Sequence, residues 1–303
     1  MAAASGRVRR ARPLLGTFVE IEAAGAARSE LEAAIDAAFE AVADVHRLMS
    51  FHEPGSDISR LNREAFAQPV VVHDWTFQVL ETAVDLHRRS RGIFDVAVAT
   101  TLQAMGLLPR LDGDAAVCPE TRPFDAIELL PERSVHFRFA DVRIDLGGIA
   151  KGFAVDRARE ALHRFNVSSG IVNAGGDLAA FGSEPQVVHV RDPRDPRRPI
   201  CSIEVSNEAL ASTGRRFDPF QSAATADSAV IDPGTSKPPD TIAGATVRAS
   251  SCVIADALTK VVMILGTGAG DLLEHYGAGA LLVSRDGDVQ ITPDLHHAVN
   301  HAA

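Results

Sequence analysis

The sequence is poor in cysteine and in large aromatic residues, and acidic residues outnumber basic ones. Its 303 residues include three cysteines, one tryptophan and one tyrosine. Cys118, Cys201 and Cys252 lie far apart without C-x-x-C spacing, which argues against a zinc or disulfide framework and favours small core thiols in a reduced compartment. The formal net charge of -10 argues against a nucleic-acid-binding protein, since phosphate neutralisation needs a basic face.

Long apolar runs and targeting signals are also missing. No run approaches the roughly 18 apolar residues of a membrane span. The first residues have neither the apolar region of a signal peptide nor a cysteine for lipid attachment. A hydrophobic content of 46% and a charged content of 23% are those of an ordinary soluble globular protein. We therefore expect a soluble, cytoplasmic protein that does not insert into membranes.

Hydrophobic periodicity predicts helices and strands in an irregular order. The clearest helix covers residues 29–50, where Ser29 and Glu32 match a capping box. Because strands mostly follow strands, we expect an α+β fold with a largely antiparallel sheet and packed helices. Further helices are predicted at 74–89, in 151–165 with Phe165 in the buried set, and at 253–265. Strands are predicted as a hairpin within 134–146, at 170–173, 186–190, 200–205, 229–231 and 245–249, and last at 279–284.

A glycine-rich junction stands out at residues 144–160, IDLGGIAKGFAVDRARE. An apolar strand is expected to lead into Asp145, Gly147 and Gly148, and Lys151 falls in the first turn of a helix. Glycines at such a place let the backbone approach a ligand, and the N–H groups at a helix start attract anions. Taken alone, the pattern is equally compatible with a tight turn in solvent, because it lacks the Walker and G-x-G-x-x-G spacings.

Further polar clusters follow along the chain. GIVNAGGDLAAFG places Gly175, Gly176 and Asp177 after a strand, a pattern that more often marks a bulge or turn than a site. ASTGRRFD and VIDPGTSKP are two more clusters. In CVIADALTK, Asp256 stands among apolar residues near a helix start, where it is either a helix N-terminal charge or a metal ligand.

Taken in chain order, these stretches resemble the ApbE family of FAD:protein FMN transferases. The resemblance runs from about Arg12 to Ile291. It implies a single ApbE-like domain over residues 13–292, with residues 1–12 and 293–303 as flexible flanking segments. The resemblance rests on LLGTFVEI, MSFHEPGSDISRLN, GIFDVAVA, IDLGGIAKGFAVD, VNAGGDLAAFG, ASTG, VIDPGTSKP and ADALTK.

The resemblance also implies an activity and a set of site residues. Members of the family bind FAD and, with Mg²⁺, transfer its FMN half to a threonine hydroxyl of an acceptor flavoprotein, releasing AMP. Gly148 would offer its backbone carbonyl to the metal, and Asp256 would bind the metal through its carboxylate. The positions that would contact FAD are Leu15, His52, Ile93, Phe94, Asp95, Asp145, Lys151 and Ile231.

Two FAD-contacting positions depart from the family pattern in side-chain type only. Leu15 stands where the family has a methionine, and His52 stands where it has an aromatic residue. Both can still pack on the ligand, His52 over a smaller area.

Two other departures concern the chemistry. Ala229 stands where the family has a histidine, which removes a possible general base and leaves Asp227 and Asp232 as candidates. Lys260 stands where the family has a threonine, one helical turn after Asp256, so an ammonium falls where a metal ligand belongs. We expect Lys260 to pair with Asp256, to act with it in catalysis, and to reduce the need for Mg²⁺.

The sequence is therefore compatible with three alternative functions. The first is transfer of FMN from FAD to a protein threonine. The second is non-catalytic binding or delivery of FAD. The third is hydrolysis of FAD to FMN and AMP, with water in place of the threonine hydroxyl.

Overall fold

The computed structural model of the protein describes residues 6–110, 126–214 and 228–301. Its helices are α1 (Arg28–Met49), α2 (Asp57–Glu64), α3 (Asp74–Arg89), α4 (Ala99–Ala104), α5 (Ala150–His163), α6 (Cys252–Leu265), α7 (Gly270–His275) and α8 (Pro293–His296), with short 3₁₀ turns at Pro131–Arg133 and Gly266–Ala269. Its strands are β1 (Arg7–Leu14), β2 (Thr17–Ala24), β3 (Val70–Val71), β4 (Ile127–Leu130), β5 (Ser134–Phe137), β6 (Ser169–Ala174), β7 (Asp177–Phe181), β8 (Gln186–Asp192), β9 (Asp195–Val205), β10 (Ala209–Gly214), β11 (Ile242–Ala249), β12 (Gly279–Ser284), β13 (Val289–Ile291) and β14 (Val299–His301).

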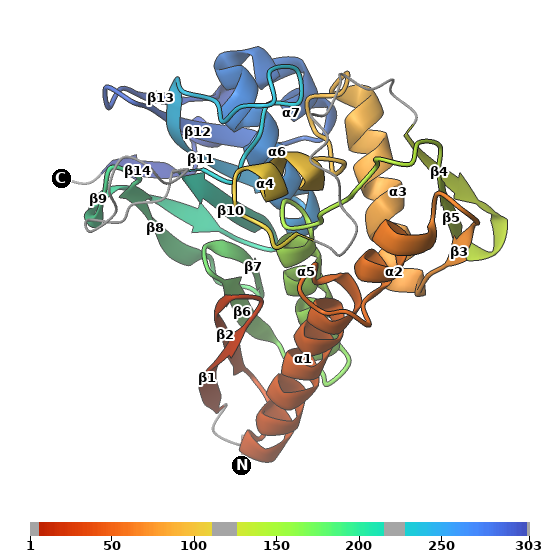
Figure 1. Ribbon diagram of the computed structural model, residues 1–303. Coiled ribbons are helices and arrows are strands. Elements are labelled where there is room, and N and C mark those ends of the chain that lie inside the picture. The colour runs from red at the N-terminus through yellow and green to blue at the C-terminus, as the bar shows by residue number, and fades with distance from the viewer. Residues whose placement is uncertain (1–5, 111–125, 215–227, 302–303) are drawn as a thin grey trace.

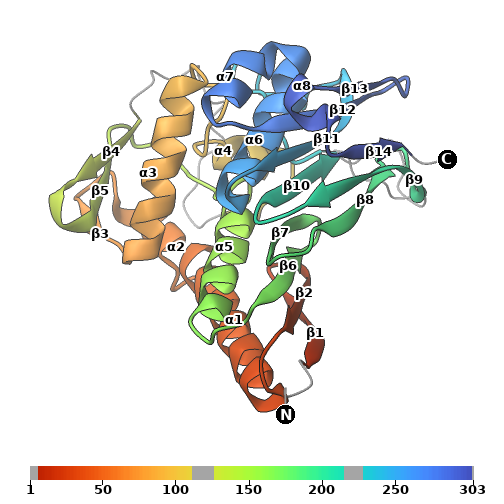
Figure 2. The same ribbon diagram turned by 180° about the vertical axis from the view of Figure 1, so that it is seen from behind.

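One long antiparallel sheet organises the fold. Its strand order is β1-β2-β6-β7-β10-β11-β12-β13, and every neighbouring pair is antiparallel. Two smaller sheets, β14-β9-β8 and β3-β5-β4, flank it. Figures 1 and 2 show α1, α5 and α6 along one face of the long sheet and the β8–β9 hairpin over the other. The prediction of an α+β fold with a largely antiparallel sheet is confirmed.

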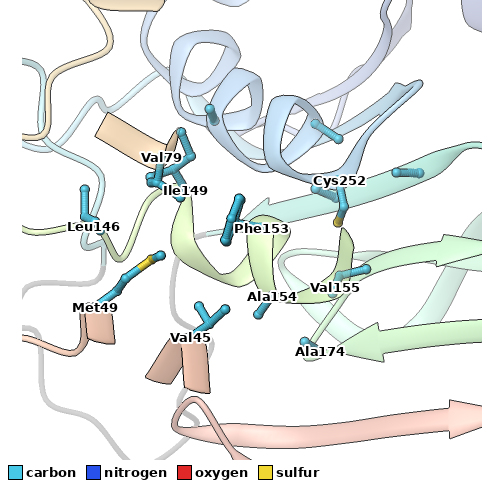
Figure 3. Packing of buried hydrophobic residues seen from close by; sticks show 14 of the residues in the cluster. Val45, Met49, Val79, Leu146, Ile149, Phe153, Ala154, Val155, Ala174 and Cys252 are labelled. Carbon is cyan, nitrogen blue, oxygen red and sulfur yellow. The ribbon is translucent and has the colours of Figure 1, made fainter. Parts of the chain in front are cut away.

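The helices bury a continuous apolar layer against the sheet. In α1 the buried side chains recur every three or four residues, from Leu31 to Met49, as an amphipathic helix requires. Phe153 and Ala154 of α5 fill the space between α1, α3 and α6 (Figure 3). A second, smaller core lies on the opposite face of the sheet, between β7, β10 and β12 on one side and β8 and β9 on the other.

The helix α6 is the most apolar part of the described chain. The segment Cys252–His275 contains an 18-residue window with a mean hydropathy of 1.6 and is long and apolar enough to cross a membrane, contrary to the expectation that no run approaches that limit. In this structure α6 is a core helix, because it packs on α5, β10 and β11. Its residues Ala255, Asp256, Ala257 and Leu258 are fully buried.

Both ends of the described chain are more ordered than expected. Residues 7–12, predicted to be flexible, form most of β1, which pairs with β2 along its whole length. In the segment 293–303, Leu295 of α8 is fully buried, and β14 pairs with Cys201–Ile203 of β9. Main-chain pairing and one buried leucine therefore order these two terminal segments, although their composition alone predicts that they are flexible.

The expected 134–146 hairpin is wrong in its second half. β5 pairs with β4 and β3, whereas residues 142–146 form no strand. The side chain of Asn62 satisfies this segment instead: its amide nitrogen donates to the Ile144 carbonyl at 2.9 Å, and its oxygen accepts the Ile144 N–H at 2.7 Å. A side-chain amide thus replaces the neighbouring strand.

Four smaller predictions are also corrected. Residues 229–231 form no strand, and β13 and β14 follow the strand predicted to be last. Phe165 is exposed because α5 ends two residues before it. At the start of α1 the cap is Ala27, whose N–H donates to Glu30 at 3.2 Å, rather than Ser29.

The crossing of α5 and α6 has no room for a side chain at residue 152. A Cβ on Gly152 would lie 2.8 Å from the Cβ of Asp256 and would collide with the carbonyl group of Cys252. Both neighbours belong to α6, so the two helix backbones meet at this glycine.

We expect Gly152→Ala to lower the free energy of unfolding by about 3 kcal/mol, because one helix must move away from the other. Chemical denaturation followed by circular dichroism measures the change. Gly55→Ala is the matched control, since a Cβ there meets nothing within 4 Å. Equal stabilities of the two variants would contradict the close approach.

Candidate functional site

The junction at Asp145–Lys151 is held from below by apolar residues. Ile144, Leu146 and Ile149 are fully buried, and they direct the intervening Asp145 and Gly147 the other way. The Asp145 carboxylate accepts the N–H of Gly147 at 3.0 Å, which closes the turn. Burial raises the pKa of Asp145, although the Gly147 N–H and the nearby His52 oppose this effect.

The second glycine junction is the turn between β6 and β7. Ala174 pairs with Asp177, so Gly175 and Gly176 form a two-residue hairpin turn. Both have positive φ, 66° and 103°, as such turns often require. The Asn173 side chain accepts the N–H of Gly176 at 2.9 Å. The turn places Asp177, which is fully buried, at the first position of β7.

Helices α5 and α6 cap each other. On α6, Asp256 accepts the N–H of Gly152, in the first turn of α5, at 2.9 Å. On α5, Asp156 accepts the N–H groups of Cys252 and Val253, which begin α6, at 3.0 and 2.9 Å. Each carboxylate therefore satisfies N–H groups at the positive end of the other helix dipole.

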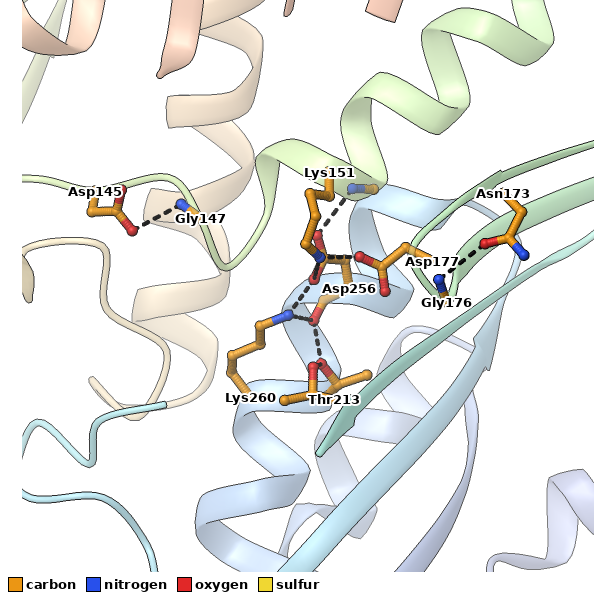
Figure 4. Close-up of polar contacts among 11 residues, drawn as sticks. Asp145, Gly147, Lys151, Asn173, Gly176, Asp177, Thr213, Asp256 and Lys260 are labelled. Carbon is orange, nitrogen blue, oxygen red and sulfur yellow. Dashed lines mark hydrogen bonds and ion pairs between the residues drawn. The ribbon is translucent and has the colours of Figure 1, made fainter. Parts of the chain in front are cut away.

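Two lysines and two aspartates from three elements meet above this crossing (Figure 4). Lys151 of α5 is paired with Asp177 of β7 and lies 3.8 Å from an Asp256 oxygen. Lys260 of α6 is paired with the same Asp256 oxygen and also donates to the Asp256 carbonyl at 3.0 Å. We call these four residues the ionic cluster. The chain has three lysines, and two of them lie in this cluster.

Burial and mutual charge decide the pKa values in the ionic cluster. Burial opposes the charge of Lys151, but Asp256 and Asp177 outweigh it and raise the pKa of its ammonium. Burial also opposes the charge of Asp256, yet Lys151 and Lys260 hold the pKa of that carboxyl below its ordinary value. For Asp177, burial together with the charge of Asp256 prevails and raises the pKa. One oxygen of Asp177 is buried without a hydrogen-bond partner among the described residues.

A cavity of about 350 Å³ opens beside the ionic cluster. Its described ionisable lining residues are Asp95, Asp145, Lys151 and Lys260. Apolar side chains cover much of the remainder, so the cavity combines an apolar wall with two fixed ammonium groups. We call it the nucleotide cavity, because the family resemblance implies that FAD would bind here. The other lining residues are Ile93, Phe94, Val96, Val98, Leu102, Gly147, Gly148, Gly175, Ser212, Thr213, Gly214, Ser228, Ala229, Val230, Ile231 and Ile264.

Most of the residues predicted for the site meet at this cavity. Leu15 does not line it: it lies in the β1–β2 turn with a φ of 55° and packs on the main core. His52 is exposed and does not line the cavity, although it lies close enough to Asp145 to oppose the rise in the pKa of that carboxyl. Asp256 lies beneath the cavity, fully buried, and contacts both lysines. The predicted residues that line the cavity are Ile93, Phe94, Asp95, Asp145, Gly148, Lys151, Ile231 and Lys260.

Of the two base candidates named from the sequence, the structure describes only Asp232. Asp232 does not line the cavity, and its carboxylate accepts the Gly234 N–H at 2.9 Å and the Thr235 hydroxyl at 3.0 Å. It therefore closes its own turn. Asp227 lies outside the described residues.

Several site residues were missed by the sequence analysis. Asp177 was assigned to a turn, although its Gly-Gly-Asp pattern resembles the first junction. Thr213 was part of a polar cluster without a role; its hydroxyl lies 2.6 Å from that of Thr259, which donates to the Asp256 carbonyl at 2.7 Å. Asp156 could have been recognised from the sequence, because it is an aspartate on the buried face of a predicted helix.

The fold and the site together define the class of protein, and comparison with known proteins gives the family. The structure superimposes on an ApbE protein from Thermotoga maritima with a TM-score of 0.85, at 24% identity over 97% of this chain and 99% of that one. The flavin transferase ApbE from Vibrio cholerae gives a TM-score of 0.82 at 21% identity, over 97% of this chain and 99% of that one. The fold is that of these two ApbE proteins.

The sequence comparisons agree with the structural ones. The family model of the ApbE family matches residues 15–282, and the chain belongs to this family. A FAD:protein FMN transferase from Vibrio cholerae is 27% identical over 85% of this chain and 81% of its own length. One from Treponema pallidum is 25% identical over 94% of this chain and 87% of its own length.

The raised pKa of Asp145 predicts a pH-dependent gain in stability on its neutralisation. When the pKa of a carboxyl group is higher in the folded than in the unfolded protein, the free energy of unfolding decreases as the pH rises from the unfolded-state pKa through the folded-state pKa. We therefore expect Asp145→Asn to raise the free energy of unfolding at pH 7, and the gain to vanish at a pH below the ordinary aspartate pKa of about 3.9.

Urea denaturation of both proteins across this pH range measures the difference. Asp240→Asn, at an exposed loop position, is the control and should show no such gain. A stability loss in Asp145→Asn at pH 7 would contradict the prediction.

Proposed function

We propose that this protein is a FAD:protein FMN transferase that acts on a threonine of an acceptor flavoprotein. The observation that carries the proposal is the nucleotide cavity, in which two fixed ammonium groups lie beside the glycine-rich start of α5. An anion placed there meets the positive charge of both ammonium groups. Membership of the ApbE family and the names of the curated relatives support the same reaction.

The reaction exchanges one phosphoryl bond for another. The threonine oxygen forms a bond to the phosphorus of the FMN phosphate. The bond from that phosphorus to the bridging oxygen breaks, and AMP leaves with this oxygen. The hydroxyl proton passes to the phosphate of the departing AMP, so atoms and charge balance.

In the proposed complex, the ends of the cavity bind different parts of FAD. Ile93, Phe94 and Asp95 face the flavin together with Asp145, whose carboxylate accepts a hydrogen bond from the ligand. Ile231 packs on the ligand. Lys151 and Lys260 contact the pyrophosphate oxygens, where charge increases as the bond to AMP breaks.

Family resemblance implies Mg²⁺ at Asp256, and the donor set here does not fit that ion. One Asp256 oxygen is paired with Lys260 and the other accepts the Gly152 N–H. Two ammonium groups neutralise the two carboxylates of the ionic cluster, so no negative charge is left for a divalent cation. No group of three acidic, histidine or cysteine side chains suited to a metal occurs in the described parts of the chain. We infer that Lys151 and Lys260 supply the positive charge themselves.

The proposed reaction does not depend on a histidine base. Phosphoryl transfer has a loose transition state in which the nucleophile is only weakly bonded, so positioning and charge neutralisation contribute most. The proton of the hydroxyl therefore leaves late, after the bond to phosphorus has begun to form. Ala229, which lines the cavity, is compatible with this order of events.

The proposed setting is the cytoplasm. The apolar helix α6 is enclosed by α5 and the long sheet, which fits a soluble protein. FAD and an acceptor flavoprotein are the proposed partners, without membrane insertion.

Incubation with FAD and a threonine-containing acceptor peptide tests the function. We expect equal amounts of AMP and FMN-labelled peptide, measured by chromatography and mass spectrometry. AMP and free FMN without labelling would identify a FAD pyrophosphatase, and bound FAD without AMP would identify a binding protein.

Asp145→Asn should weaken FAD binding by roughly 10- to 100-fold, the cost of one charged hydrogen bond. Fluorescence titration measures the affinity. Since the same variant is expected to be more stable than the native protein, a loss of affinity cannot come from unfolding. Unchanged affinity would remove Asp145 from the flavin site.

Removal of Lys260 should create a dependence on metal. We expect the native protein to bind FAD and to release AMP equally well with excess chelator or with Mg²⁺. In Lys260→Thr the freed Asp256 oxygen becomes available, so Mn²⁺ should bind, as electron paramagnetic resonance detects, and FAD affinity should depend on the metal. Lys237→Thr, at an exposed position, is the control. The prediction is contradicted if the native protein and Lys237→Thr both lose FAD affinity and AMP release in excess chelator.

A further inference from the structure

A second cavity, of about 670 Å³, lies on the opposite face of the long sheet. Its floor is the sheet itself, where Thr17, Glu20, Asn173 and Thr246 line it, and its wall is strand β8. The β8–β9 hairpin covers only part of this face, since the second core joins it to β7, β10 and β12 and not to β1 or β2. We call this cavity the sheet groove.

The sheet groove continues into the nucleotide cavity. Gly175, Ser212, Thr213 and Gly214 line both cavities. These four residues belong to the β6–β7 turn and the end of β10. A molecule lying in the groove therefore reaches the place where Lys151 contacts the proposed pyrophosphate.

The end of β10 also has an open main-chain edge at this place. β7 pairs with β10 only at Ala209 and Leu210, because β7 begins at Asp177. β11 continues to pair with β10 as far as Gly214. Within the described chain, residues 212–214 therefore have a strand neighbour on one side only. Such an edge can accept an added strand, which gains main-chain hydrogen bonds.

The groove is less suited to a second nucleotide than to a polypeptide. The lysines of the nucleotide cavity do not line it. The charged residues that do line it are Glu20, paired with Arg9 at 2.7 Å, Asp192, paired with Arg194 at 2.9 Å, and Arg191, so two of the three are acidic. At its β2 end, Phe18 is 72% exposed, which offers an aromatic surface to a bound side chain.

We propose that the acceptor protein binds through an extended segment in the sheet groove. The segment adds to the open edge of β10 and delivers its threonine hydroxyl between Gly175 and Thr213. FAD and acceptor thus approach the ionic cluster from opposite faces of the sheet. This inference rests on the proposed function, since it names where that reaction receives its second substrate.

Two variants test the groove without altering the nucleotide cavity. Phe18→Ala removes the exposed aromatic surface, and His189→Trp adds bulk at an exposed position of β8 that lines the groove. Each has a matched control at an exposed position that lines neither cavity: Phe66→Ala for the first and Val187→Trp for the second.

The probe is a short fluorescein-labelled peptide with one threonine between glycine and serine residues. Fluorescence anisotropy measures its binding to the FAD-loaded protein, and mass spectrometry measures its labelling by FMN. We expect both groove variants to weaken peptide binding and kcat/KM for the peptide by about tenfold. FAD affinity should remain native, and the two controls should match the native protein in every measurement.

The outcomes separate the groove from the reaction. Native peptide binding in both groove variants overturns the proposal, as does failure of the native protein to bind the peptide. A parallel loss of FAD affinity also overturns it, because the groove would then belong to the FAD site. If the native protein binds the peptide through the groove but transfers no FMN, the docking surface stands and the proposed function fails.

Discussion

The reciprocal capping of α5 and α6 is the constraint on which the site depends. Asp156 satisfies the start of α6 and Asp256 satisfies the start of α5, so neither helix can shift along the other without exposing N–H groups. Gly152 allows the two backbones to meet. The same Asp256 that caps α5 anchors the two lysines, so the geometry of the charges follows directly from the packing of the helices.

Charge balance explains why so many ionised groups can be buried together. A single carboxylate at the position of Asp256 would lose several kcal/mol of hydration free energy. Two ammonium groups and the Gly152 N–H offset that loss, so the pKa of Asp256 stays below its ordinary value. The site therefore holds its positive charge in the absence of substrate, as electrostatic preorganisation requires.

Much of the fold could be predicted from the sequence, because α1, α3, α5 and α6 show a helical period and most strands of the long sheet are apolar runs between turn residues. The family motifs also indicated most of the cavity lining. Prediction failed where one side chain substitutes for regular structure, as Asn62 does beside Ile144. It also failed for contacts between distant segments, such as Lys151 with Asp177, since no local pattern records which strand ends beside which helix.

The lysines of the ionic cluster also have a consequence for turnover. A metal ion can depart with a phosphate product, whereas Lys151 and Lys260 are covalently attached to buried helices and stay in place. In the proposed reaction, AMP leaves as a phosphate anion that must separate from both ammonium groups. Product release then becomes a slow step whose rate increases with ionic strength, because dissolved salt screens the attraction that retains the nucleotide.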